Sequence, residues 1–154
     1  MKLRLEWMHP LTLADASDQN LIYSFDFTKL PETAGVYVFG RRYGNQFEAL
    51  YVGKGGKLRR RTKGHLNNLR LMQHLKNAKN GTRVLLAGRF IPRPGQQEDK
   101  CLGILERALI RYFLSEGHDL VNKQGTRLRR HEIASVGSKR NVPTLMFVDR
   151  GRGE

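Results

Sequence analysis

A glutamate lies on the apolar face of the most clearly helical segment of the sequence. Leu102, Glu106 and Leu109 are spaced i, i+4 and i+7 in the helix predicted over residues 100–117, so the carboxylate points with the apolar stripe. An unpaired charge removed from water is costly, so this carboxylate needs a cation. Spacing leaves two partners open, namely an arginine in a structural salt bridge or a metal ion at a catalytic site.

A second candidate lies in the segment ALYVGKGGKLRRRTKGH, residues 49–65, where glycines precede a basic run. Arg61 and His65 are four residues apart, so a helix places them on one face. The planar guanidinium of arginine suits phosphate oxygens, and the glycines let a backbone approach a ligand closely. The rest of the run is either a solvated surface or a grip on a nucleic-acid backbone, and it consists of Lys57, Arg59, Arg60 and Lys63.

Two tyrosines lie in segments that predict a β-hairpin, residues 35–40 and 48–53. A suitable register puts Tyr37 and Tyr51 on one face of the sheet. They are either part of a site or core aromatics with locally bonded hydroxyls.

The strands and helices that must position these residues follow one another in the order ββαβα. This order predicts an α/β (α+β) domain. A short, mostly antiparallel sheet of three strands is flanked by helices. The predicted strands are 35–40, 48–53 and 83–91, and the predicted helices are 57–79, with a possible interruption at Gly64, and 100–117. We expect residues 1–34 to form a lead-in packed on or near the domain, and residues 35–123 to form its core. Residues 124–154 are expected to form a basic extension with a possible late strand over 144–149.

Charge indicates the partner. The 154 residues carry a net charge of +14, and residues 35–154 hold 25 basic against 9 acidic side chains. Such a basic body favours a polyanion, most often nucleic acid. No apolar stretch predicts a membrane span and no signal peptide is expected, while the single Cys101 fits a reducing compartment, so we expect a cytoplasmic protein with no membrane partner. The sequence offers no zinc-ligand spacing, phosphate-binding glycine loop, or serine or cysteine nucleophile constellation.

Taken together, these residues resemble the GIY-YIG nuclease family over roughly residues 30–123. GVY at 35–37 and YVG at 51–53 match the motifs that give the family its name. The family then expects an arginine, a histidine or tyrosine, a glutamate and an asparagine in that order. These positions fall on Arg61, His65, Glu106 and Asn122, and Lys54 matches a residue seen in several members.

The resemblance implies a small GIY-YIG-type domain that hydrolyses phosphodiester bonds in DNA with one Mg²⁺ or Mn²⁺ per active site. It implies that Glu106 holds the ion, Arg61 clamps the phosphate and Asn122 braces the site. Tyr37 and Tyr51 position the attacking water, and one of them, or His65, takes its proton. The residues expected to hold the DNA backbone are Lys54, Lys57, Arg59, Arg60 and Lys63.

Several alternatives stay open at this point. The DNA is duplex or single-stranded, and the protein is a monomer or a homodimer. An inactive nucleic-acid-binding domain on the same scaffold and a small basic RNA-associated protein are the competing functions.

Overall fold

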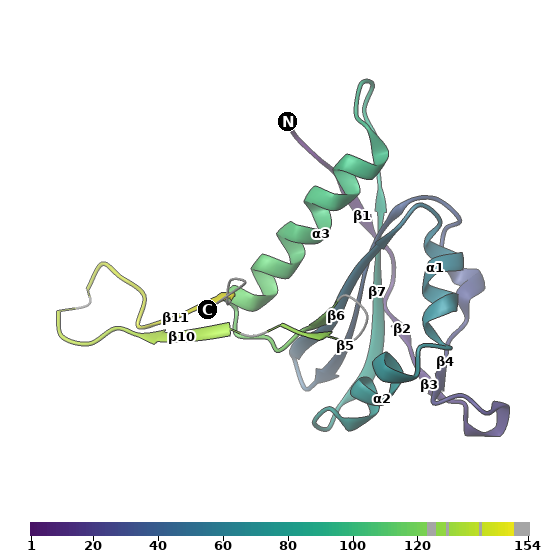
Figure 1. Ribbon diagram of the computed structural model, residues 1–154, viewed down its shortest axis with the longest axis horizontal. Helices are drawn as coiled ribbons and strands as arrows, with labels where there is room; N and C mark the ends of the chain where they lie inside the picture. The colour runs from purple at the N-terminus through teal and green to yellow at the C-terminus, as the bar shows by residue number, and fades with distance from the viewer. Residues whose placement is uncertain (123–125, 129, 139, 150–154) are drawn as a thin grey trace.

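The computed structural model describes residues 1–122, 126–128, 130–138 and 140–149 (Figure 1). Its strands are β1 (Leu5–Trp7), β2 (Leu11–Thr12), β3 (Ala14–Asp15), β4 (Tyr23–Ser24), β5 (Gly35–Tyr43), β6 (Gln46–Gly55), β7 (Thr82–Phe90), β8 (Val121–Asn122), β9 (Thr126–Arg127), β10 (Arg130–Ala134) and β11 (Leu145–Asp149). Its helices are α1 (Leu58–His65), α2 (Leu69–Asn77) and α3 (Glu98–Ser115), with short 3₁₀ turns at η1 (Ser17–Gln19) and η2 (Phe27–Lys29).

One antiparallel sheet organises the fold in the order β1-β7-β5-β6, and β2 pairs β7 beyond β1. The two long strands β5 and β6 form the predicted hairpin around Gly44, whose φ of +59° favours glycine. The predicted mixed α/β class with a mostly antiparallel sheet is confirmed. The sheet is wider than expected, because two short strands of the lead-in add to the outer edge of β7.

Helices cover both faces of this sheet (Figure 1). Alternate side chains of β5 and β6 point to opposite faces. On one face Tyr37, Phe39 and Tyr51 pack with apolar residues of α1 and α2, whereas on the other Val38 and Val52 pack with α3. The strand β6 therefore lies between α1 and α2 on one face of the sheet and α3 on the other.

The helical segment predicted over 57–79 is two helices rather than one. Gly64 lies inside α1, and the interruption of the helix falls at residues 66–68, between α1 and α2. The side chain of Asn68 accepts a hydrogen bond from the Leu71 N–H at 3.1 Å, which caps the start of α2. The interruption thus follows from an asparagine N-cap and not from the glycine.

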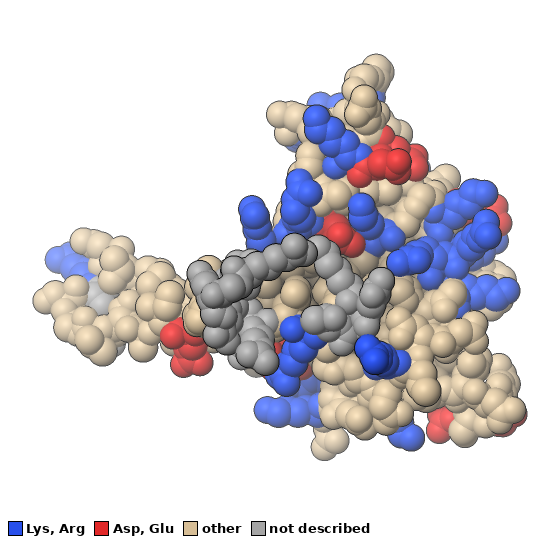
Figure 2. Space-filling model, in the orientation of Figure 1, with Lys and Arg blue, Asp and Glu red and all other residues tan. Residues whose placement is uncertain are grey.

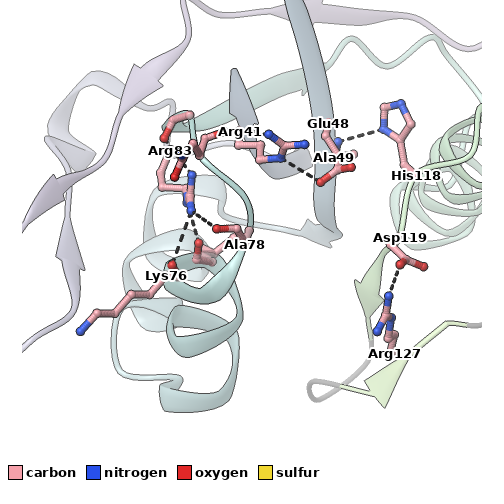
Figure 3. A network of polar contacts seen from close by, with 12 residues as sticks. Arg41, Glu48, Ala49, Lys76, Ala78, Arg83, His118, Asp119 and Arg127 are labelled. Atoms are coloured by element: carbon pink, nitrogen blue, oxygen red, sulfur yellow. Dashed lines mark hydrogen bonds and ion pairs between the residues drawn. The ribbon is translucent and has the colours of Figure 1, made fainter. Parts of the chain in front are cut away.

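Arg83 of β7 fastens the end of α2 to the sheet (Figure 3). It is only 8% exposed, and its guanidinium donates to backbone carbonyls at and beyond the end of the helix. The acceptors are the oxygens of Leu75, Lys76, Ala78 and Gly81, at 2.5–3.5 Å. The last carbonyls of a helix lack hydrogen-bond partners within it and attract cations. Arg83 supplies these carbonyls with both hydrogen-bond donors and a positive charge.

Residues 130–149 include a hairpin that projects from the rest of the described fold (Figure 1). Its strands are β10 and β11, and β11 coincides with the late strand predicted over 144–149. The Phe147 ring lies against Gly117 just beyond α3, where an added Cβ would be 3.1 Å from the ring. None of the described helices combines the length and the apolar character that a membrane crossing requires.

Candidate functional site

The β5–β6 register brings the two predicted tyrosines onto one face of the sheet. Tyr37 is opposite Gly53, and Phe39 is opposite Tyr51, so the tyrosines are diagonal neighbours. Their rings stack with centroids 6.3 Å apart and planes 24° apart. Both rings are buried, so the structure places them in the core and at the candidate site together.

Gly53 is the residue that lets Tyr37 lie across the neighbouring strand. An added Cβ at Gly53 would come within 2.4 Å of both Cζ and the hydroxyl oxygen of Tyr37. Real Cβ atoms do not approach other atoms so closely, so any larger residue displaces the ring. The glycine of YVG is therefore a packing requirement for the tyrosine of GVY.

His65 closes the cluster from the end of α1. Its Nε2 is 2.5 Å from the Tyr37 hydroxyl oxygen, and its ring lies 5.2 Å from the Tyr51 ring, centroid to centroid. Burial, and after it the charge of Arg61, lower the pKa of His65 from 6.5 to about 4. The imidazole is consequently neutral near pH 7. A neutral ring can accept the Tyr37 O–H at Nε2 while it keeps its own proton on Nδ1.

Arg61 lies one helical turn before His65, on the exposed side of the cluster. The stem of its side chain packs beside Gly55, where an added Cβ would be 2.9 Å from Cβ of Arg61. Burial raises the pKa of both Tyr37 and Tyr51, and the Arg61 charge opposes that rise. The guanidinium is therefore close enough to the two hydroxyls to stabilise negative charge there.

Glu106 approaches the same tyrosines from α3. Its charge raises the pKa of Tyr37 and of Tyr51, as a nearby anion must. The side chain is half-buried, and in the part of the chain that the structure describes it has neither an ion pair nor a hydrogen bond. The salt-bridge alternative is therefore absent among these residues, and the carboxylate is left available for a ligand.

Two side chains from the segment after α3 form hydrogen bonds with the free edge of β6, behind the site. Asn122 is 2% exposed, accepts a hydrogen bond from the Val52 N–H at 3.0 Å and donates to the Val52 carbonyl. His118 Nδ1 accepts a hydrogen bond from the Ala49 N–H at 2.9 Å (Figure 3). Asn122 thus braces the backbone between Tyr51 and Gly53. His118 was missed by the sequence reasoning, because a single histidine after a helix carries no spacing signal.

Basic side chains surround the site. On the face drawn in Figure 2, lysines and arginines gather over α1 and along α3. A hollow of about 560 Å³ has Arg60, Arg61 and His65 among its lining residues, and Glu98 also contributes a carboxylate to it. Glu98 is a second residue that the sequence did not single out. The exposed residues of the predicted backbone grip are Lys54, Lys57, Arg60 and Lys63.

Arg59 differs from the other members of the basic run. Its guanidinium donates to the carbonyls of Leu30 and Thr28, each at 3.0 Å, and pairs with Glu32 at 2.9 Å. These contacts tie the lead-in to α1. Arg59 therefore fastens the lead-in to α1 with three of its five N–H donors.

The side chains at the site that could bind a metal ion are few, so they fit only an ion that the protein holds weakly. Among the described residues, no group of three histidine, cysteine, aspartate or glutamate side chains lies together as a metal cage. Glu106 offers a single unpaired carboxylate whose charge is felt by Arg61. Mg²⁺ is commonly held in this way, by one or two carboxylates together with waters and substrate phosphates.

No protein-family model, curated protein or solved structure matches this chain. The function must therefore be inferred from the geometry of the site.

Proposed function

We propose that the protein is a metal-dependent DNA endonuclease of the GIY-YIG type. The observation that carries this proposal is the half-buried, unpaired carboxylate of Glu106, close to two stacked tyrosines and Arg61. A domain that only bound nucleic acid would gain nothing from an unpaired carboxylate among phosphate-binding cations. The net charge of +14 and the exposed cations of α1 support nucleic acid as the substrate.

Each side chain has a physical role in the hydrolysis. Arg61 holds a non-bridging oxygen of the scissile phosphate and offsets the negative charge that develops in the transition state. Lys57, Arg60 and Lys63 hold neighbouring phosphates, which raises affinity without reading sequence. Asn122 keeps β6 in place, so that Tyr51 stays in register with the rest of the site.

The contact between Tyr37 and His65 favours one route for the proton. The proton that the attacking water gives up passes to His65 Nε2, which the Tyr37 hydroxyl holds in place. The hydroxide forms the new P–O bond, the bond to the 3′ oxygen breaks, and that oxygen takes a proton from solvent. The Arg61 charge is one cause of the low pKa of His65, so a phosphate bound by Arg61 raises that pKa when a base is needed.

Glu106 is the residue that would hold Mg²⁺ or Mn²⁺. Such an ion, when bound, supplies stabilisation of the charge on the phosphate and on the leaving oxygen. Since the protein contributes one carboxylate, we expect metal affinity to depend on bound substrate.

A cleavage panel tests the proposal. It uses plasmid, single-stranded and branched DNA, and RNA, each with Mg²⁺ or Mn²⁺. The wild-type protein should cleave at least one DNA substrate, and Glu106→Ala should abolish cleavage while binding, measured by fluorescence anisotropy, is retained. Glu116→Ala is the matched control, because it removes an exposed carboxylate just beyond the same helix.

Two results would contradict the proposal. Metal-dependent cleavage by Glu106→Ala would remove the assigned role of the carboxylate. Binding of DNA by the wild-type protein without nicking in either metal would favour the non-catalytic alternative, and preference for RNA would favour an RNA-associated protein.

A further inference from the structure

The lead-in and α1 enclose a second hollow beside the candidate site. It has a volume of about 570 Å³, and its lining residues are Phe27, Glu32, Lys57, Arg59, Arg60 and Lys63. Lys57 and Arg60 also line the hollow that Arg61 lines, so the two hollows adjoin. A strand of nucleic acid that is held at Arg61 therefore has the second hollow next to it.

Hydrogen bonds fix the lead-in against the first turn of α1. The N–H groups of Leu58 and Arg59 donate to the carbonyls of Thr33 and Pro31, at 2.9 and 3.1 Å. The first N–H groups of a helix have no partner within it, so the lead-in satisfies donors that α1 leaves free. The wall that the lead-in contributes to the second hollow is thus held in place by the backbone of the helix.

The second hollow carries positive charge that no carboxylate cancels. Glu32, the one carboxylate among its described lining residues, is paired with Arg59 at 2.9 Å. Lys57, Arg60 and Lys63 are exposed and form no ion pair within the described part of the chain. Cations that converge on one concave space attract an anion, and the phosphates of a nucleic-acid strand supply such anions in series.

Phe27 determines where one of these cations lies. Lys63 Nζ is 4.5 Å from the centroid of the Phe27 ring, which is the geometry of a cation–π contact. The ring is half-buried and packs against the core, so its position is fixed. Lysine has a flexible four-carbon stem, and holding its ammonium on a fixed ring lowers the entropy that is lost when it meets a phosphate.

We propose that the second hollow binds a backbone phosphate that neighbours the one held by Arg61, and that Phe27 of the lead-in is a positioning residue for this contact through Lys63. The inference rests on the proposed nucleic-acid substrate and adds the path that the strand takes. Cations gather over α1 and along α3 on the face drawn in Figure 2, so charge alone leaves two directions open from the site. The adjoining hollow favours the direction over α1 and toward the lead-in.

Equilibrium binding of the full chain to DNA tests this path. Fluorescence anisotropy with a fluorescein-labelled duplex, and with its single strand, gives the dissociation constant over a salt series in EDTA, which prevents metal-dependent cleavage. Lys63→Ala should weaken binding at least threefold and make the log–log salt slope shallower by about 0.9 on the duplex or 0.7 on the single strand. The matched control is Arg111→Ala, which removes one exposed cation of α3 and should leave the dissociation constant within twofold.

Variants of Phe27 separate positioning from packing. Phe27→Leu keeps an apolar side chain against the core but loses the ring, so it should weaken binding about as much as Lys63→Ala does. Phe27→Tyr keeps the ring and should bind DNA within twofold of the wild type. Because the ring acts through Lys63, adding Phe27→Leu to Lys63→Ala should cause no further loss, whereas a purely structural role would lower binding equally in both backgrounds.

The outcomes distinguish this inference from the proposed nuclease function. Equal losses for Lys63→Ala and Arg111→Ala, or additive losses in the double variant, would overturn the inference and leave the nuclease proposal standing. The expected binding pattern without cleavage in Mg²⁺ or Mn²⁺ would remove the nuclease and leave the phosphate subsite. A wild-type protein that binds neither form of DNA would overturn both.

Discussion

The buried imidazole of His65 makes the stability of this protein depend on pH. In the unfolded chain the ring takes up a proton as the pH falls through about 6.5, whereas in the folded protein its pKa is lowered to about 4. Between these values the unfolded state binds more protons, so the free energy of unfolding falls as the pH falls. The contribution is present in full above the unfolded pKa and is lost by about pH 4. At about 1.4 kcal/mol per pKa unit, the full shift corresponds to about 3.5 kcal/mol, of which about 3 kcal/mol is lost between pH 7 and pH 4.

Urea denaturation at a series of pH values from 7 to 4 measures this effect. The wild-type protein should lose about 3 kcal/mol more than His65→Gln over that range, because carboxylates such as Asp15 and Asp26 titrate in both proteins and cancel in the difference. His9→Gln, which removes an exposed histidine, should behave as the wild type. An NMR titration of the His65 ring in the wild-type protein gives its pKa directly and does not depend on how any variant folds.

Parallel stability curves for the wild type and His65→Gln would refute the reasoning. So would a His65 ring that titrates near 6.5 in the folded protein. Either result would mean that the ring is hydrated and that its contact with Tyr37 does not hold in solution.

Three further perturbations test how the site is built. Arg61→Ala should lower the turnover of DNA cleavage at least tenfold more than Arg60→Ala does, and equal losses in steady-state assays would make Arg61 an ordinary phosphate contact. Gly53→Ala should lower the free energy of unfolding by about 1–3 kcal/mol and move Tyr37 off His65, which chemical denaturation and the His65 NMR titration would detect. Arg83→Met should lower the free energy of unfolding by about 2–3 kcal/mol, because it leaves buried carbonyls without their charged donor, and an unchanged urea midpoint would contradict this.

Features that depend on neighbouring residues could be predicted from the sequence. Strand alternation identified the hairpin that carries Tyr37 and Tyr51, and helical spacing put Arg61 and His65 on one face and Glu106 on the apolar stripe. The break between α1 and α2 was misplaced at Gly64. A glycine inside a helix costs about 1 kcal/mol and is tolerated, whereas an asparagine cap starts a new helix.

Features that depend on distant segments could not be predicted. The basic run is uniform in sequence, and only the lead-in carbonyls distinguish Arg59, which donates hydrogen bonds to them, from the exposed Arg60. The lead-in strands joined the sheet because β7 had a free edge, and a free edge is a property of the assembled sheet.

The sequence by itself determined the order of the tyrosines, the arginine, the histidine and the glutamate, and it determined the strongly basic character of the chain. These follow from residue types and from local periodicity. Only the tertiary structure decided that His65 is neutral and in contact with Tyr37, 28 residues away, and that Glu106 has no partner among the described residues. Burial and the distance between remote side chains set both properties, and neither is encoded in the spacing along the chain.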